Sequence, residues 1–105
     1  MATSTIPYNM PLKRTTINLA PSVISSTGQV WQTSGKGRVY LNPGITVSGA
    51  TQIVAVSNGN WSSMNDNVVL TPYVYRSNVV SWYISKGTAS QLDSAFIQHA
   101  EVLYY

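Results

Sequence analysis

The stretch that decides the fold reads Val68-Val-Leu-Thr-Pro-Tyr-Val-Tyr75, then Arg76-Ser77-Asn78, then Val79-Val-Ser-Trp-Tyr-Ile-Ser85. Along both arms, side chains expected to be buried alternate with others, which is the period of a strand that has one buried face. The polar tripeptide between the arms is typical of a turn. The stretch therefore predicts an antiparallel β-hairpin, the strongest in the sequence.

The alternation also predicts which side chains of this hairpin are buried. Ser81 and Ser85 are expected to face outward, and Pro72 marks an edge strand or a bulge because it cannot donate a ladder hydrogen bond. The side chains expected to face the core are Val68, Leu70, Val74, Val80, Trp82 and Ile84.

Shorter strand candidates surround this hairpin. They cover residues 15–19, 29–33, 38–41, 45–47, 52–56 and 96–105. The Gly-rich connector 34–37 predicts a second hairpin. Residues 52–56 are apolar on both faces, which predicts a central strand covered on both sides. Residues 58–67 and 86–95 are expected to be loops, the second with room for one helical turn.

No segment has the period of a helix, and turns recur every 8–15 residues. The pattern predicts an all-β fold, an antiparallel β-sandwich of jelly-roll or lectin-like type. We expect a short extended N-terminal arm over residues 1–14 and one β-sandwich domain over residues 15–105.

Composition narrows the classes of function. The chain has 105 residues, no Cys, 9% charged residues and a formal net charge of +3. Without cysteine it holds no disulfide, thiolate zinc site or thiol nucleophile. No run of about 18 apolar residues is present for a membrane span. The N-terminus lacks the basic-then-apolar pattern of a secretory signal.

Residues for catalysis or metal binding are scarce. His99 is the single histidine, and Glu101 lies two positions along the same strand, but no nucleophile motif accompanies them. Asp66 and Asp93 lie in separate predicted loops, so a catalytic carboxylate pair is not indicated. We expect no enzymatic activity, no cofactor and no metal site.

One candidate ligand site lies in the polar loop around Trp61. An indole surrounded by amides suits a sugar, because the ring covers the apolar CH face while amides bond the hydroxyl groups. Trp61 folded back as a plug of its own loop is the alternative. The candidate residues are Asn58, Asn60, Trp61, Asn65 and Asp66.

A second candidate surface is rich in tyrosine. Tyr73, Tyr75 and Tyr83 are expected on one face of the strong hairpin. Because tyrosine is enriched at interfaces, we expect these residues and Tyr105 to form an oligomer interface. A face simply coated with aromatic rings is the alternative.

A nucleic-acid alternative rests on the predicted hairpin over 29–41. Trp31 and Tyr40 would provide stacking rings, with Lys36 and Arg38 beside them. The positive charge is too sparse for a typical nucleic-acid surface, so this reading stays secondary.

The N-terminal arm is a candidate anchor. Alternate apolar side chains and two cations suit docking on a neighbouring subunit or on a capsid or tail protein. The anchoring candidates are Tyr8, Met10, Leu12, Lys13 and Arg14.

The part from residue 49 to residue 105 resembles the C-terminal β-sandwich knobs of phage tail fibres and head fibres, and H-type lectins. The resemblance rests on Thr51-Gln-Ile-Val-Ala-Val-Ser57, on Asn78-Val-Val-Ser-Trp-Tyr-Ile84, and on a terminal strand Phe96-Ile-Gln-His-Ala-Glu-Val-Leu-Tyr-Tyr105 that ends on aromatics. It implies a homotrimer on a virion that contacts host-surface glycans.

Because no fibre shaft is present, the resemblance points to a decoration protein, a head fibre, or a tail-fibre or adaptor component. Its expected partners are other copies of itself, capsid or tail proteins, and a host glycan, without membrane insertion. A free carbohydrate-binding module and a small single-strand nucleic-acid-binding barrel are the alternatives.

Overall fold

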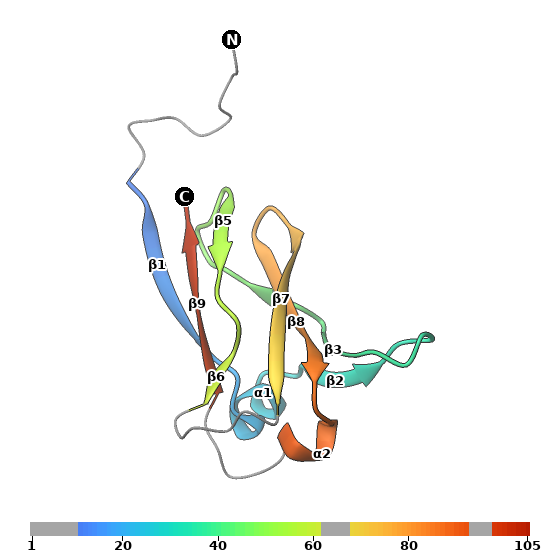
Figure 1. The fold of residues 1–105 in the computed structure, drawn as a ribbon. Helices are drawn as coiled ribbons and strands as arrows, with labels where there is room; N and C mark the ends of the chain where they lie inside the picture. Colours follow the sequence, from blue (N-terminus) through green and yellow to red (C-terminus); the bar gives the residue numbers. More distant parts are fainter. Residues whose placement is uncertain (1–10, 62–67, 93–97) are drawn as a thin grey trace.

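The fold consists of two antiparallel sheets and two short helices in the computed structural model, which describes residues 11–61, 68–92 and 98–105 (Figure 1). The four-stranded sheet contains β1 (Lys13–Asn18), β5 (Ile53–Val56), β6 (Asn60–Trp61) and β9 (Gln98–Tyr104). The five-stranded sheet contains β2 (Val30–Thr33), β3 (Val39–Asn42), β4 (Ile45–Thr46), β7 (Val69–Arg76) and β8 (Val79–Lys86). The helices are α1 (Pro21–Ser26) and α2 (Ala89–Leu92). The predicted all-β class is confirmed.

In the four-stranded sheet, β9 lies at the centre, with β1 along one edge and β5 and β6 along the other. The prediction that residues 52–56 form a central strand covered on both sides is wrong. Within the described ranges β5 pairs with β9 alone, and Val54 is 49% exposed. An apolar run is compatible with a strand that is buried on both faces. It does not determine whether another part of the chain packs on the second face.

In the five-stranded sheet, the predicted hairpins are both present. β7 pairs with β8, and β2 pairs with β3. β3 and β4 follow one another along the second edge of β8, and the chain bends between them at Pro43 and Gly44. Pro72 lies in β7, which has β8 as its only paired strand in the described ranges, and this edge position agrees with the prediction.

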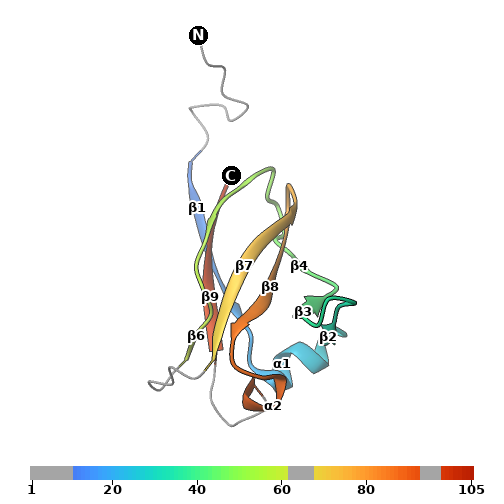
Figure 2. The ribbon, with the colours of Figure 1, turned by 45° about the vertical axis from the view of Figure 1, so that its right-hand side comes forward.

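The two sheets are joined along the side where β5 and β6 meet β7. The amide of Ile53 donates to the carbonyl of Ser77 at 3.1 Å, and Gly59 forms an isolated bridge with Leu70. The turned view in Figure 2 separates the β1–β9 ribbon from the β7–β8 ribbon. β1 and β2 are therefore the outer strands, away from this join.

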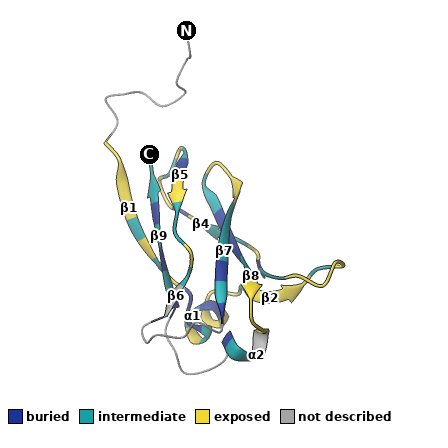
Figure 3. Cartoon of the chain, in the orientation of Figure 1, coloured by how far each residue is buried: buried dark blue, intermediate teal, exposed yellow. Residues whose placement is uncertain are grey.

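Buried residues occur in both sheets and both helices (Figure 3), and within the described ranges their side chains form one hydrophobic cluster. Its members are Leu19, Ile24, Leu41, Val47, Ile53, Val68, Leu70, Val80, Trp82, Leu92, Ala100 and Val102. The inward faces predicted for β7 and β8 are confirmed except at Val74, which is 50% exposed. Val74 lies where the β7–β8 register shifts near the hairpin turn, so the simple alternation fails there.

Helix α1 contradicts the expectation that no helical segment is present. It has proline in its first turn, a favoured position, and it buries Ile24. With six residues it is too short to show a helical period in the sequence. Helix α2 fits the helical turn expected within residues 86–95. Within the described ranges, neither helix has the length and apolar run needed to cross a membrane.

The N-terminal boundary also differs from the prediction. β1 begins at Lys13, so Lys13 and Arg14 belong to the sheet and not to an extended arm. Lys13 pairs with Tyr104, and Arg14 pairs with Leu103. Leu12 is exposed, whereas the expected anchors in residues 1–10 lie outside the described residues.

Candidate functional site

The candidate site is the outer side of the five-stranded sheet, where strand alternation brings tyrosines together. In β8 the buried Trp82 is followed by Tyr83, and in β3 the buried Leu41 is preceded by Tyr40. Tyr40 and Tyr83 are register partners, so their side chains project from the same side of the sheet, away from the core. Tyr73 of β7 lies across Tyr83 on that side.

The rings and two arginines form a connected surface. The ring centres of Tyr73 and Tyr83 lie 6.1 Å apart at a tilt of 37°. The guanidinium carbon of Arg38 lies 4.1 Å from the ring centre of Tyr83, and that of Arg76 lies 5.3 Å from Tyr75. Both distances are within the range of a cation–π contact. We call this surface the tyrosine face: Tyr40, Tyr73, Tyr75, Tyr83, Arg38 and Arg76.

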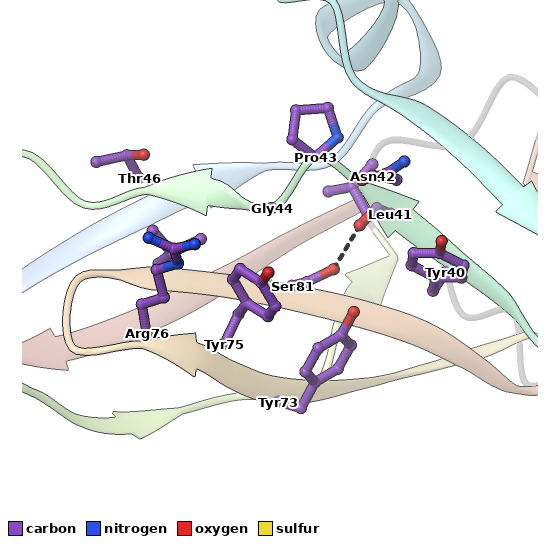
Figure 4. Close-up of a pocket in the computed structure, with 11 residues that line it drawn as sticks. Tyr40, Leu41, Asn42, Pro43, Gly44, Thr46, Tyr73, Tyr75, Arg76 and Ser81 are labelled. Carbon is purple, nitrogen blue, oxygen red and sulfur yellow. Dashed lines mark hydrogen bonds between the residues drawn. The ribbon is translucent and has the colours of Figure 1, made fainter. Parts of the chain in front are cut away.

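Two hollows lie side by side on the tyrosine face and share the rings of Tyr40 and Tyr73. The first, of about 440 Å³, is drawn in Figure 4. It is lined by Tyr40, Leu41, Asn42, Pro43, Gly44, Thr46, Tyr73, Tyr75, Arg76, Val79 and Ser81. The second, of about 410 Å³, is lined by Ser34, Arg38, Tyr40, Tyr73 and Tyr83. Together they provide aromatic walls and several hydrogen-bonding groups.

Polar contacts hold the wall of the first hollow in place. Ser81 is buried, and its hydroxyl donates a 2.7 Å hydrogen bond to the carbonyl of Leu41 (Figure 4). The sequence predicts that Ser81 faces outward, on the side of β8 opposite Trp82. It is buried nonetheless: Tyr73 of β7 is its register partner on one side, and the chain at Leu41 and Gly44 lies against it on the other. Next to Leu41, the side-chain amide nitrogen of Asn42 donates to the side-chain oxygen of Gln32 at 2.6 Å.

The tyrosine face carries positive charge that no described side chain neutralises. Neither hollow is lined by an acidic residue from the described ranges. Of the three acids in the chain, Asp66 and Asp93 lie outside those ranges, and Glu101 pairs with Arg14 in the other sheet. Arg38 and Arg76 therefore favour an anionic group at this surface.

The other predicted site residues lie apart from this surface. Tyr105 follows β9 of the four-stranded sheet, and its backbone amide donates to the carbonyl of Gln52 at 2.8 Å. Asn58 is exposed. Asn60 and Trp61 form β6 against β9, so the prediction of an uninterrupted loop over residues 58–67 is wrong at these two positions.

Asn65 and Asp66 lie outside the described residues, so the proposed loop site is only partly described. The stacking platform expected for nucleic acid is divided as well. Arg38 and Tyr40 contribute to the tyrosine face, whereas Trp31 packs against the core and Lys36 lies exposed in the β2–β3 turn.

The sequence pattern predicts Tyr73, Tyr75 and Tyr83 on one face of the hairpin, but it does not connect them with Tyr40 or Arg76. The alternation of the β3 strand candidate shows that Tyr40 points away from Leu41. Only the pairing of β3 with β8 places it beside Tyr83.

Comparison with known proteins adds no family. No protein-family model, curated protein or solved structure matches this chain. The described residues also contain no group of three metal-ligating side chains.

Proposed function

We propose that this protein is a non-enzymatic virion structural protein that assembles as a homo-oligomer and binds acidic saccharides of a host surface on its tyrosine face. The observation that carries the binding proposal is the pair of adjoining hollows, with aromatic walls, two arginines and no acidic lining residue in the described ranges.

The chemistry of the first hollow matches the two sides of a sugar ring. Tyrosine rings pack against the apolar CH face, as at many amphipathic contacts. The phenol groups of Tyr40, Tyr73 and Tyr75 can donate and accept hydrogen bonds, as can the hydroxyl of Thr46. A volume of about 440 Å³ is within the usual range for a small-molecule site.

The charge of the face selects an acidic saccharide over a neutral one. A guanidinium binds carboxylate or sulfate through paired, charge-assisted hydrogen bonds. Arg76 lines the first hollow and Arg38 the second, so a bound sugar chain would meet a cation in each. The Trp61 loop is not needed for this binding mode.

The oligomer interface first expected on Tyr73, Tyr75 and Tyr83 competes for the same surface. An isologous contact through this face would bring two arginines of each copy into one interface. Like charges brought together in an interface are unfavourable. The same cations favour an anionic ligand, which is why we place the saccharide here and the contact between copies elsewhere.

The virion location rests on the resemblance of residues 49–105 to fibre knobs and on the low content of charged residues. A decoration protein, a head fibre and a tail-fibre component all remain within this proposal. Mass spectrometry of purified virus particles whose genome encodes this chain tests the location. If the protein is absent from the particle, the free carbohydrate-binding module is the better interpretation.

A saccharide array tests the binding proposal directly. Sialylated, uronate-containing and sulfated oligosaccharides are printed beside their neutral counterparts, and the wild-type protein is expected to bind the acidic set. Tyr73→Ala and Arg76→Gln are each expected to weaken binding at least tenfold. Arg14→Gln and Tyr105→Ala are matched controls in the other sheet, and both should bind as wild type.

Two results would overturn the binding proposal. One is failure of the wild type to bind any acidic saccharide. The other is unchanged binding by both tyrosine-face variants. If Tyr73→Ala instead dissociates the oligomer and leaves saccharide binding intact, the tyrosine face is a contact between copies.

Single-strand nucleic acid is a second candidate, favoured by one contact. Arg38 stacks over Tyr83 and lies beside Tyr40, an arrangement in which bases could stack next to a cation. Binding of a fluorescent oligonucleotide that weakens steeply with salt would support this candidate. Saccharide binding without oligonucleotide binding would exclude it.

A further inference from the structure

β1 leaves one edge of the four-stranded sheet open. The strand lies at the outer margin of the fold, on the left in Figure 1, and β9 pairs with it from Lys13 to Asn18. Among the described residues no strand pairs with its other edge. An unpaired edge presents N–H and C=O groups that can pair with another strand.

The hydrogen bonds fix which residues of β1 face this open edge. The amide of Leu19 donates to the carbonyl of Gln98 at 2.7 Å, so the backbone at position 19 faces β9. Residues along an antiparallel strand alternate between facing the partner strand and facing away from it. Arg14, Thr16 and Asn18 therefore direct their backbone N–H and C=O groups away from β9.

Bonds on the far side of β9 give the same assignment. Thr16 is the register partner of Glu101. The amide of Ser57 donates to the carbonyl of Glu101 at 2.9 Å, and the amide of Glu101 donates to the hydroxyl of Ser57 at 2.8 Å. Because the backbone of Glu101 is engaged with Ser57, it does not bond Thr16.

We propose that two copies of this chain pair β1 with β1 in antiparallel fashion, with Thr16 on the two-fold axis. This register sets Arg14 opposite Asn18 of the partner subunit. It pairs all the outward backbone groups of the strand, giving about six hydrogen bonds at two per residue pair.

Other registers of the β1–β1 pairing leave outward backbone groups of β1 without a partner in the β1 strand of the other copy. Opposed residues of two joined strands must project from the same side of the sheet, so the axis has to pass through a residue. An axis at Thr15 would leave Asn18 opposite a residue outside β1, and an axis at Ile17 would do the same to Arg14. The register centred on Thr16 is the one that uses the whole strand.

The charges of β1 fit this pairing. Cations on an edge strand usually discourage association. Here the guanidinium of Arg14 pairs with Glu101 over its own sheet, and the amine of Lys13 lies 6.0 Å from the ring centre of Tyr104. In the proposed register Arg14 faces an amide across the axis and not a second cation.

The inference deepens the self-association that belongs to the proposed function, and it names the surface responsible. A two-fold contact of this kind closes at two copies, unlike the trimer implied by the fibre-knob resemblance. It joins the four-stranded sheets into one continuous sheet and leaves the tyrosine face, which lies on the other sheet, open to ligand.

Sedimentation equilibrium at micromolar concentration provides the main test. The wild type is expected at twice the chain mass of 11.4 kDa. Thr16→Pro removes an outward N–H and spares the bonds to β9, so it is expected to sediment as single copies with an unchanged circular dichroism spectrum. Thr16→Val keeps the N–H and is expected to remain dimeric. A dimeric, folded Thr16→Pro protein would overturn the inference.

Cross-linking tests the register without disturbing the backbone, and it decides the question should Thr16→Pro fail to fold. The chain has no cysteine, so Thr16→Cys introduces a single thiol. Hydrogen-bonded antiparallel pairs place their Cα atoms about 5.5 Å apart, a separation that a disulfide spans. Oxidation should yield a covalent dimer. Ser48→Cys, at an exposed position away from β1, should stay monomeric on the same non-reducing gel.

These results separate the two proposals. Single copies of the wild type would overturn both the self-association and the β1 pairing. A wild-type dimer that persists in Thr16→Pro, with no Thr16→Cys cross-link, would overturn the β1 pairing alone. Saccharide binding by a monomeric Thr16→Pro protein tests the tyrosine face independently of both.

Discussion

The indole Nε1 of Trp82 donates a 3.1 Å hydrogen bond to the carbonyl oxygen of Ser57, and this bond links the two sheets. Trp82 is fully buried in β8, whereas Ser57 follows β5 and is bonded to β9 through Glu101. This hydrogen bond therefore fixes the orientation of the largest fully buried side chain, in addition to the packing that holds it in the core.

Trp82→Phe should lower the free energy of unfolding by about 2–4 kcal/mol. It leaves the carbonyl of Ser57 without its donor and shrinks a fully buried side chain. Trp31→Phe is the matched control, because the buried Nε1 of Trp31 has no hydrogen-bond partner in the described residues. Urea denaturation followed by circular dichroism should show a loss below about 1 kcal/mol for the control. Equal losses would show that ring volume alone matters.

Replacing Gln98 should stabilise the protein. Its side chain is 1% exposed, and neither amide atom has a hydrogen-bond partner in the described residues. Because an unsatisfied buried amide is unfavourable, Gln98→Met should raise the free energy of unfolding by about 1–2 kcal/mol in urea denaturation. Gln32→Met, at an exposed position whose oxygen accepts from Asn42, should give no gain. A loss of stability in Gln98→Met would contradict the prediction.

The β7–β8 hairpin could be predicted because its information is local. Alternation over 68–85 fixes which side chains face the core, and the polar tripeptide at 76–78 fixes the turn. The error at 52–56 has a different origin. An apolar run is compatible with an edge strand as well as a central one, and only the rest of the chain determines which of the two it becomes.

The tyrosine face was predictable in part for the same reason. Tyr73 and Tyr83 share a face through the local period of one hairpin. Tyr40 joins them only because β3 pairs with β8, a contact between segments that are far apart in the sequence. Arg76 lies at the end of β7, next to a register shift that no local pattern indicates.

Gly44→Ala should destabilise the bend between β3 and β4. A Cβ at this position would lie 2.8 Å from Cγ1 of Val79 and 2.9 Å from the backbone oxygen of Val80. Backbone cannot move aside easily, so we expect a loss of about 1–3 kcal/mol in thermal or urea denaturation. Gly35→Ala is the control, because a Cβ there meets nothing within 4 Å. Similar stability for the two variants would contradict the close packing of β4 on β8.

Ser81→Ala should weaken both the fold and the first hollow of the tyrosine face. It removes a buried hydrogen bond to the Leu41 carbonyl, which costs about 1–2 kcal/mol of unfolding free energy. Since that bond holds β3 beside β8, acidic saccharide binding on the array should fall as well. Ser85→Ala, on the same strand, removes exposed hydrogen bonds with the Val69 carbonyl and the Thr71 hydroxyl. Because water can replace exposed bonds, this control should change stability by no more than about 0.5 kcal/mol and leave binding intact. Wild-type binding by a destabilised Ser81→Ala protein would show that the saccharide does not depend on this wall.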